Sequence, residues 1–316
     1  MLPTLARDGM RYWRLQPDAR LRAWIVCYFL VEPDPNSTAS SDDRRQLLLP
    51  DGHSELVFRL SSGFERWRVG ERGSRSLMQT SYVIGGRSHS VLTRSIGTLR
   101  LAGVKLDPRA LRALIGTPLG DFRDGTVSFA DLNCRALSDL EDAVAHARSA
   151  ASLAHMFNRF FLRSLYDVDI DEPLIRPLIQ ELRNTRGAQS ILQWAREHKV
   201  DARTLERRFV AAMGMTPKQY ARIVRFKHSY QRLMSGAEAG RMHLDGYYDE
   251  SHFNREFKEF LGVAPTAWLA GDAAQRTTVS DHLLETEFAA ATGQRAPLFA
   301  LRSGRICRSR AFNAFK

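Results

Sequence analysis

The sequence predicts an α+β N-terminal domain, rich in strands and ending in helices, followed by an all-α domain with two helix-turn-helix units joined by a long helix. Apolar residues alternate in short runs in the first third and take helical spacing later. In addition, "DARTLERRFVAAMGMTP" from Asp201 recurs as "DESHFNREFKEFLGVAP" from Asp249, 48 residues further on. A chain of 316 residues is long enough for two cores.

Strands are predicted in the first third because short apolar runs are separated by turn residues. The segment "QLLLPDGHSELVFRL" has a Pro-Asp-Gly turn between two such runs, and it is followed by "ERWRVGE", "SYVIGG", "SVLTRS" and "TLRLAGVKL". The apolar run "AWIVCYFLV", from Ala23 to Val31, is too short to cross a bilayer and is interpreted as a buried strand. We find no export signal and expect a cytoplasmic protein.

Helical spacing begins at Pro108, where "PRALRALIG" predicts a helix that Gly116 ends. A longer helical stretch, roughly Leu137 to Tyr166, carries a wide apolar stripe: Leu153, Met156, Phe157, Phe160 and Phe161. We interpret the stripe as core, with a dimer seam as the alternative.

These patterns divide the chain into four parts. Residues 1–166 form the β-rich domain, which we expect to fold alone, and residues 167–173 form an acidic linker that ends in proline. Residues 174–271 form the helical domain, and residues 272–316 form a basic extension. The extension either adds general affinity for polyanions or serves as a basic arm beside the second helix-turn-helix unit.

Composition indicates a polyanionic partner. The chain has 46 Lys and Arg against 35 Asp and Glu, a net charge of +11, which favours nucleic acid first and an acidic membrane surface second. A solvated basic surface without a partner is the alternative. Cys27, Cys134 and Cys307 lie far apart, without CxxC or zinc spacing, and are predicted to be free thiols.

The repeated segment predicts the same short helix twice. Each copy opens with an Asp that suits a helix N-cap, ends at Gly214 or Gly262, and has a proline three residues later. At about 100° per residue, the apolar anchors face inward: Leu205 and Phe209 in the first copy, Phe253 and Phe257 in the second. The outward residues are therefore Arg203, Thr204 and Arg207, then Ser251, His252 and Arg255.

The surroundings of the repeat indicate two helix-turn-helix units. "SILQWAREHKV" supplies the helix before Asp201, so that the repeated helix is the second of a pair and would enter a major groove of DNA. Between the copies, Pro217 to Met234 contains no internal Gly or Pro and predicts a helix about 27 Å long. That length approaches the roughly 34 Å between successive major-groove faces. One chain could therefore read two neighbouring grooves.

The segment "GYYDESHFNREFKEFLGVAP", together with "GMTPKQYARIVRFK", resembles the DNA-binding domain of the AraC/XylS family of bacterial transcriptional regulators from about Ser190 to Leu269. The first half is similar to a domain of unknown function attached to some of these regulators, with "LLLPDGHSELVFRL" as one landmark. The resemblance implies duplex DNA as the partner and an N-terminal domain that senses a signal or dimerises. A small-molecule effector, a homodimer and contact with RNA polymerase are further implied partners.

The second unit departs from the family pattern ahead of its repeated helix, where the chain reads "GAEAGRMHLDGYYD". Gly236, Gly240 and Gly246 each weaken a helix by about 1 kcal/mol when they lie inside it. We therefore expect the first repeated helix to contribute more to DNA recognition than the second. The alternative function is a sensor or protein-interaction module that has lost specific DNA binding.

The candidate DNA-binding residues are expected to make different kinds of contact with DNA. Arg203 and Arg207 can contact base edges or phosphates. Thr204 and Ser251 could likewise contact a phosphate or a base. His252 fits the family pattern or supports the turn, whereas Arg208 and Arg255 suit phosphates. The full predicted set is Arg203, Thr204, Arg207, Arg208, Ser251, His252, Asn254 and Arg255.

No catalytic, cofactor or metal site is predicted, and the chain is expected not to be an enzyme. His53 and Glu55 would share a strand face, as metal ligands can, but no third ligand has useful spacing. "VIGGR", from Val83 to Arg87, lacks the rest of a phosphate-binding glycine motif.

Overall fold

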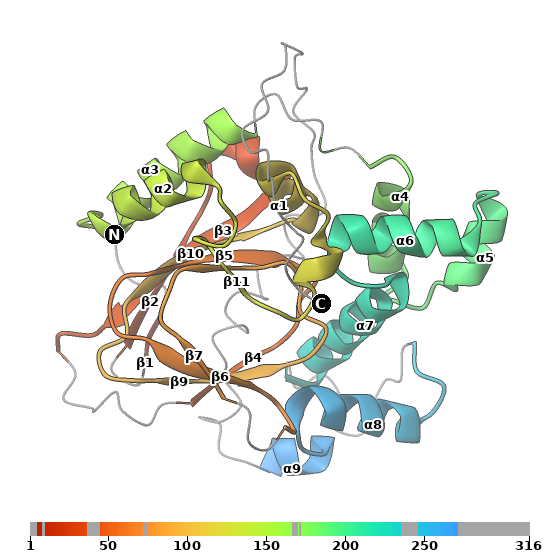
Figure 1. The fold of residues 1–316 in the computed structure, drawn as a ribbon. Helices are drawn as coiled ribbons and strands as arrows, with labels where there is room; N and C mark the ends of the chain where they lie inside the picture. Colours follow the sequence, from red (N-terminus) through yellow and green to blue (C-terminus); the bar gives the residue numbers. More distant parts are fainter. Residues whose placement is uncertain are drawn as a thin grey trace.

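The computed structural model has a two-sheet β domain covered by helices on one side, and a second group of helices beside it (Figure 1). It describes residues 5–7, 10–36, 45–71, 75–165, 170, 172–234 and 246–270. The predicted fold class is confirmed: a β-rich N-terminal domain precedes an all-α region. The basic extension, residues 272–316, lies outside the described residues.

Within the described residues the strands form two antiparallel sheets. The larger sheet has the order β1-β2-β3-β10-β5-β8-β11 and the smaller one β4-β9-β6-β7. The strand bounds in the larger sheet are β1 Leu5–Arg7, β2 Met10–Leu15, β3 Ile25–Pro33, β5 Ser54–Arg59, β8 Tyr82–Ile84, β10 Leu101–Leu106 and β11 Val127–Ser128. Those in the smaller sheet are β4 Arg45–Leu48, β6 Phe64–Arg68, β7 Ser76–Met78 and β9 Val91–Ser95.

The predicted Pro-Asp-Gly turn separates strands that belong to different sheets. Strand β4 pairs with β9, whereas β5 pairs with β10 and β8. Gly52 in this turn has φ +80°, a left-handed conformation that favours glycine. The two runs therefore do not form a hairpin; the turn carries the chain from one sheet to the other.

Three helices cover the outer face of the larger sheet: α1 (Pro108–Ile115), α2 (Arg135–Ala145) and α3 (Ala150–Ser164). Gly116 ends α1 with φ 69°, as predicted. The helical stretch predicted roughly from Leu137 to Tyr166 consists of two helices, because a new helix starts after Ser149. Ser149 and Ser152 exchange hydrogen bonds in a capping box, which satisfies the backbone donors at the start of α3.

The apolar stripe of α3 lies in the core. Leu153, Phe157 and Phe161 are almost completely buried against the larger sheet, and Met156 and Phe160 pack on them while half-buried. Phe157 contacts the rings of Tyr28 and Phe58, with centroids 5.0 and 5.3 Å away. Of the two interpretations of the stripe, the packing therefore favours core over a dimer seam.

The helical region has six helices among the described residues: α4 (Ile175–Asn184), α5 (Ile191–Glu197), α6 (Ala202–Met213), α7 (Pro217–Met234), α8 (Glu250–Leu261) and α9 (Pro265–Ala270). The repeated helices α6 and α8 have the predicted caps, Asp201 with Gly214 and Asp249 with Gly262. The spacer helix α7 runs from Pro217 to Met234 as predicted. The first helix of the second unit, including Gly236, Gly240, Arg241 and His243, lies outside the described residues.

The helical region packs directly on the β domain. Leu49, which follows β4, is buried in the same core as Phe209 and Tyr220. A short helix of the β domain, η2 (Leu119–Phe122), contacts the C-terminal half of α6, where a Cβ on Gly120 would be 3.3 Å from Val210 Cγ1. Between the two regions, Ile170 is buried in the β-domain core and Glu172 pairs with Arg112.

The two cysteines that the structure describes differ in their bonding. Cys27 is buried and forms no disulfide, whereas Cys134 is disulfide-bonded, so the prediction of a free thiol is wrong for Cys134. Cys307 lies outside the described residues.

In the part of the chain that the structure describes, no helix has the length and apolar character needed to cross a membrane.

Candidate nucleic-acid interface

The first helix-turn-helix unit consists of α5 and α6. The carboxylate of Asp201 accepts a hydrogen bond of 2.8 Å from the backbone N–H of Thr204, and this bond lowers the pKa of Asp201. Leu205 and Phe209 are fully buried on the inner face of α6, as predicted. They pack with Trp194 of α5, which is also buried.

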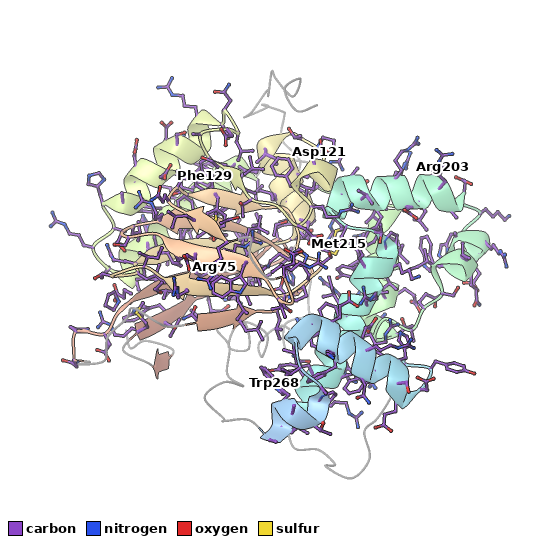
Figure 2. The ribbon with its side chains drawn as sticks, turned by 60° about the horizontal axis from the view of Figure 1, so that its bottom comes forward. Arg75, Asp121, Phe129, Arg203, Met215 and Trp268 are labelled. Atoms are coloured by element: carbon purple, nitrogen blue, oxygen red, sulfur yellow. The ribbon has the colours of Figure 1, made fainter. Side chains whose placement is uncertain are left out.

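The outer face of α6 presents the predicted arginines. Arg203, Arg207 and Arg208 are exposed, and Thr204 is half-buried next to the cap. Arg203 lies at the end of α6 that points away from the β domain, while the other end meets η2 (Figure 2). The N-terminal half of a recognition helix is the part that contacts base edges. Docking on the β domain therefore leaves that half of α6 open to solvent.

The second unit presents a comparable face on α8. Ser251 and Arg255 are exposed, and His252 and Asn254 are half-buried. Arg255 Nε donates to the backbone oxygen of Ser251 at 3.3 Å, so its guanidinium follows the helix surface. The ring of His252 contacts Tyr247, with centroids 5.3 Å apart, which fits the supporting role among its two predicted ones.

An ion-pair network, which was not predicted, fixes α8 against α7. Glu256 is buried on α8 and accepts hydrogen bonds from Arg222 Nε at 2.7 Å and Arg225 Nη2 at 3.2 Å. Arg222 also bonds Glu259 at 2.7 Å. Burial acts to raise the pKa of Glu256, but the bond from Arg222 and the charge of Arg225 lower it below its usual value. The sequence signal was an acid within the apolar stripe formed by Phe253, Phe257 and Phe260.

One exposed aromatic residue was also missed. Tyr248 has 94% of its surface exposed and directly precedes Asp249, the N-cap of α8. The residue before it, Tyr247, is buried over the Arg225 guanidinium, with the guanidinium carbon 5.1 Å from the ring centroid. An adjacent pair of tyrosines in the sequence does not tell which ring faces inward. The structure thus adds Tyr248 to the surface beside the second recognition helix.

The residues considered for a metal site or a phosphate-binding loop have structural partners. Arg87 pairs with Glu55 at 2.6 Å, and His53 lies 3.6 Å from Asp51. Gly86, from "VIGGR", lies against the helical region, where a Cβ would be 3.0 Å from Met215 Cε. Within the described ranges, no group of three or more His, Cys, Asp or Glu residues is placed to hold a metal ion.

The comparison with family models decides the identity of the helical region. Residues 194–271, from within α5 to the residue after α9, match the model of a helix-turn-helix domain of the AraC type. The C-terminal part of this chain is an AraC-type helix-turn-helix domain. Residues 13–128 match a domain of unknown function, DUF6597, which precedes the AraC-type domain in this chain.

Solved structures give weaker likenesses. ToxT from Vibrio cholerae, solved with an unsaturated fatty acid bound, has 12% identity over 74% of this chain and 94% of its own, with a TM-score of 0.40. The AraC-like transcriptional activator CuxR has 9% identity over 71% and 88% of the two chains, with a TM-score of 0.23. No curated protein matches the chain. The identification of the AraC-type domain rests on the family model and not on these likenesses.

Proposed function

We propose that this protein is a transcriptional regulator that binds duplex DNA sequence-specifically, with α6 in one major groove and α8 in the next. The exposed N-terminal half of α6, with Arg203 and Arg207 on its outer face, carries the proposal. An arginine guanidinium can donate two hydrogen bonds to O6 and N7 of guanine. The predicted residues of α8 and the stiff spacer α7 support a second contact one groove away.

Replacing the two arginines of α6 singly tests this function. Arg203→Ala or Arg207→Ala is expected to cost about 1 to 3 kcal/mol of binding free energy where the side chain reads a base, and to relax preference at one position. Binding would be measured on sequences selected from a random duplex pool. Arg135→Ala is a matched control, because this residue of α2 is 94% exposed and lies in the other domain.

The salt dependence of binding separates DNA recognition from the alternative interaction module. Neutralising a phosphate contributes about −0.9 to the slope of log affinity against log salt. Arg208→Ala is therefore expected to reduce the slope by about one unit and to leave sequence preference unchanged. If the unaltered protein selects no sequence from the pool, the module without specific DNA binding is the better description.

The N-terminal domain is proposed to regulate DNA binding, by an effector or by self-association. Self-association would require a surface other than the α3 stripe, because Leu153, Phe157 and Phe161 are used within the core. We place the protein in the cytoplasm, where a regulator of this kind meets its operator. No catalytic role is proposed.

A further inference from the structure

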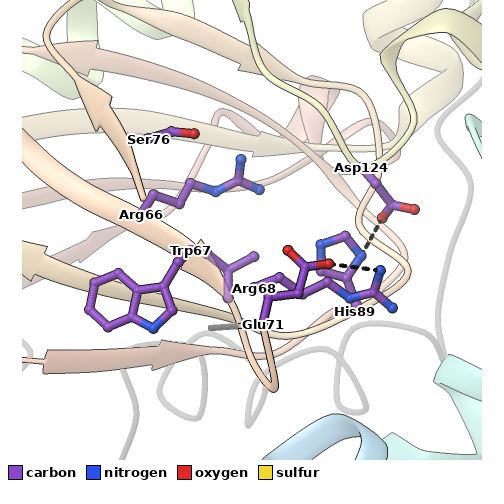
Figure 3. Close-up of a pocket in the computed structure, with 8 residues that line it drawn as sticks. Arg66, Trp67, Arg68, Glu71, Ser76, His89 and Asp124 are labelled. Atoms are coloured by element: carbon purple, nitrogen blue, oxygen red, sulfur yellow. Dashed lines mark ion pairs between the residues drawn. The ribbon is translucent and has the colours of Figure 1, made fainter. Parts of the chain in front are cut away.

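The β domain contains a polar cavity of about 250 Å³ at the smaller sheet (Figure 3). Strand β6 and the residues after it supply much of its wall, and β7, β9 and the loop that carries Asp124 complete it. The lining residues are Arg66, Trp67, Arg68, Glu71, Ser76, His89, Val91 and Asp124. None of these residues belongs to the DNA-binding surface described above.

Strand alternation directs Arg66 into the domain. Side chains of a strand point alternately to its two faces. Phe64, two residues earlier, is buried in the core between the sheets, so Arg66 shares that inward face. Trp67 points the other way (Figure 3), where the guanidinium of Arg75 lies 5.0 Å from its ring centroid.

The other charges around the cavity have partners. Arg68 lies 3.6 Å from Glu71, and Arg87, deeper in the domain, bonds Glu55 at 2.6 Å. Asp124 lies 3.1 Å from His89 and accepts bonds from the backbone N–H and the hydroxyl of Ser88. Burial acts to raise the pKa of Asp124, but these partners lower it to about 2, so this carboxylate is ionised at neutral pH.

Arg66 is the exception among these charges. Its Nε and Nη2 atoms are buried without a hydrogen-bond acceptor in the part of the chain that the structure describes, and so is Nη1 of the neighbouring Arg87. Burial and the charge of Arg87 lower the pKa of Arg66. Arg66 as a residue is half-buried, and buried N–H donors such as its Nε and Nη2 usually have a hydrogen-bond partner in folded proteins, because an unpaired one is costly. A group with negative charge and hydrogen-bond acceptors would complement these donors.

We propose that this cavity binds a small organic or inorganic oxyanion, a carboxylate or a phosphate group, through the guanidinium of Arg66. The planar guanidinium donates two parallel hydrogen bonds to either group, which makes arginine well suited to both. The cavity is smaller than the roughly 300 to 1,000 Å³ of pockets for drug-sized ligands. The ligand is therefore of metabolite size, with its charged group at Arg66.

The walls of the cavity reach both helix-turn-helix units. Val69, next to Arg68, lies close to the end of α8, where a Cβ on Gly262 would be 2.9 Å from it. Asp124 donates its backbone N–H to Gly86 at 2.9 Å, and Gly86 lies against Met213 and Met215 at the end of α6. If the proposed function holds, an anion in the cavity is placed to change the relative position of α6 and α8.

Titration of the full-length protein with inorganic phosphate and with acetate, at matched ionic strength in sodium chloride, tests the site. At least one of the two is expected to raise the melting temperature saturably and to give a calorimetric isotherm of one site. Arg66→Gln should remove both effects. Arg94→Gln should keep them, because Arg94 neighbours Glu65 on the outward face of the same sheet and does not line the cavity.

The preferred probe identifies the ligand class: a response to phosphate alone indicates a phosphorylated ligand, and one to acetate alone indicates a carboxylate. Absence of saturable binding by both probes, or equal binding to Arg66→Gln, would overturn the proposal. Neither measurement uses DNA, so failure of the anion site and failure of the proposed function are distinguishable.

A second measurement distinguishes a ligand-binding role of Arg66 from a purely structural one. Without either probe, Arg66→Gln is expected to melt at the same temperature as the unaltered protein or higher, because the change removes a guanidinium whose buried Nε and Nη2 have no acceptor among the described residues. A clear loss of melting temperature under those conditions would show that the guanidinium supports the fold, and the proposal would fail.

Discussion

Phe209→Ala is expected to lower the free energy of unfolding of the helical domain by about 3 to 5 kcal/mol, the usual cost of removing a buried aromatic ring. Phe209 has no exposed surface and meets the ring of Tyr220 with centroids 5.8 Å apart. The core that contains Phe209 is built from both domains and includes Leu49. Truncation therefore leaves a cavity that one helix cannot close by itself.

Urea unfolding followed by circular dichroism would measure this loss. Glu206→Ala is the matched control on the same helix, because Glu206 is exposed and alanine favours helix. The control is expected to stay within about 0.5 kcal/mol of the unaltered protein. A Phe209→Ala protein as stable as the control would contradict the assigned inner face of α6. DNA binding is expected to fall in proportion to the unfolded fraction.

Glu256→Ala is expected to have the second largest effect, a loss of about 3 kcal/mol. Removing one partner of a buried ion pair costs about 3 to 5 kcal/mol, because the remaining charge stays buried. The lower end of this range applies here, because the Arg222 side chain is 25% exposed and keeps its ion pair with Glu259. Arg225, 13% exposed, loses its carboxylate partner at 3.2 Å. The loss should release α8 from α7 and weaken DNA contacts of the second unit.

Glu259→Ala provides the control for this network. Glu259 lies on the same helix and pairs with the same arginine, but its side chain is 53% exposed. Exposed pairs of this kind contribute about 0 to 1 kcal/mol. Hydrogen exchange of α8 amides would show whether the loss in Glu256→Ala is local to the second unit. Equal effects of the two substitutions would contradict the importance of burial.

The ion-pair network around Glu256 predicts that the free energy of unfolding depends on pH. Because the pKa of Glu256 is lower in the folded protein than its usual 4.5, its contribution is complete above pH 4.5 and is lost as the pH falls through the folded value. Glu256→Gln cannot ionise and lacks this contribution. The difference in unfolding free energy between the unaltered protein and Glu256→Gln is therefore expected to shrink as urea titrations move below about pH 4.5. A constant difference would exclude ionised Glu256 as its source.

Local features of the sequence were sufficient to predict the two recognition helices. Asp201 and Asp249 cap them, and Gly214 and Gly262 end them in left-handed conformations, because both signals act within a few residues. Helical periodicity likewise predicted the burial of Leu205 and Phe209. The break between α2 and α3 was missed because its capping box consists of two serines, a weak sequence signal.

Contacts between distant segments could not be predicted in this way. Apolar alternation predicts that a strand exists but not which strand it pairs with, so the sequence did not show that β4 and β5, on either side of one turn, belong to different sheets. Glu256 was placed on a helix, but its arginine partners come from another helix more than 30 residues away.

The sequence by itself determined the helix-turn-helix repeat, the outward residues of α6 and the β-rich character of the N-terminal domain, because caps, turns and periodicity are local. Only the tertiary structure decided that the C-terminal end of α6 docks on η2 while Arg203 faces away. It alone also left Nε and Nη2 of Arg66 buried without an acceptor among the described residues. The physical reason is that burial and pairing depend on which elements meet in space, and one chain's local pattern does not encode those distances.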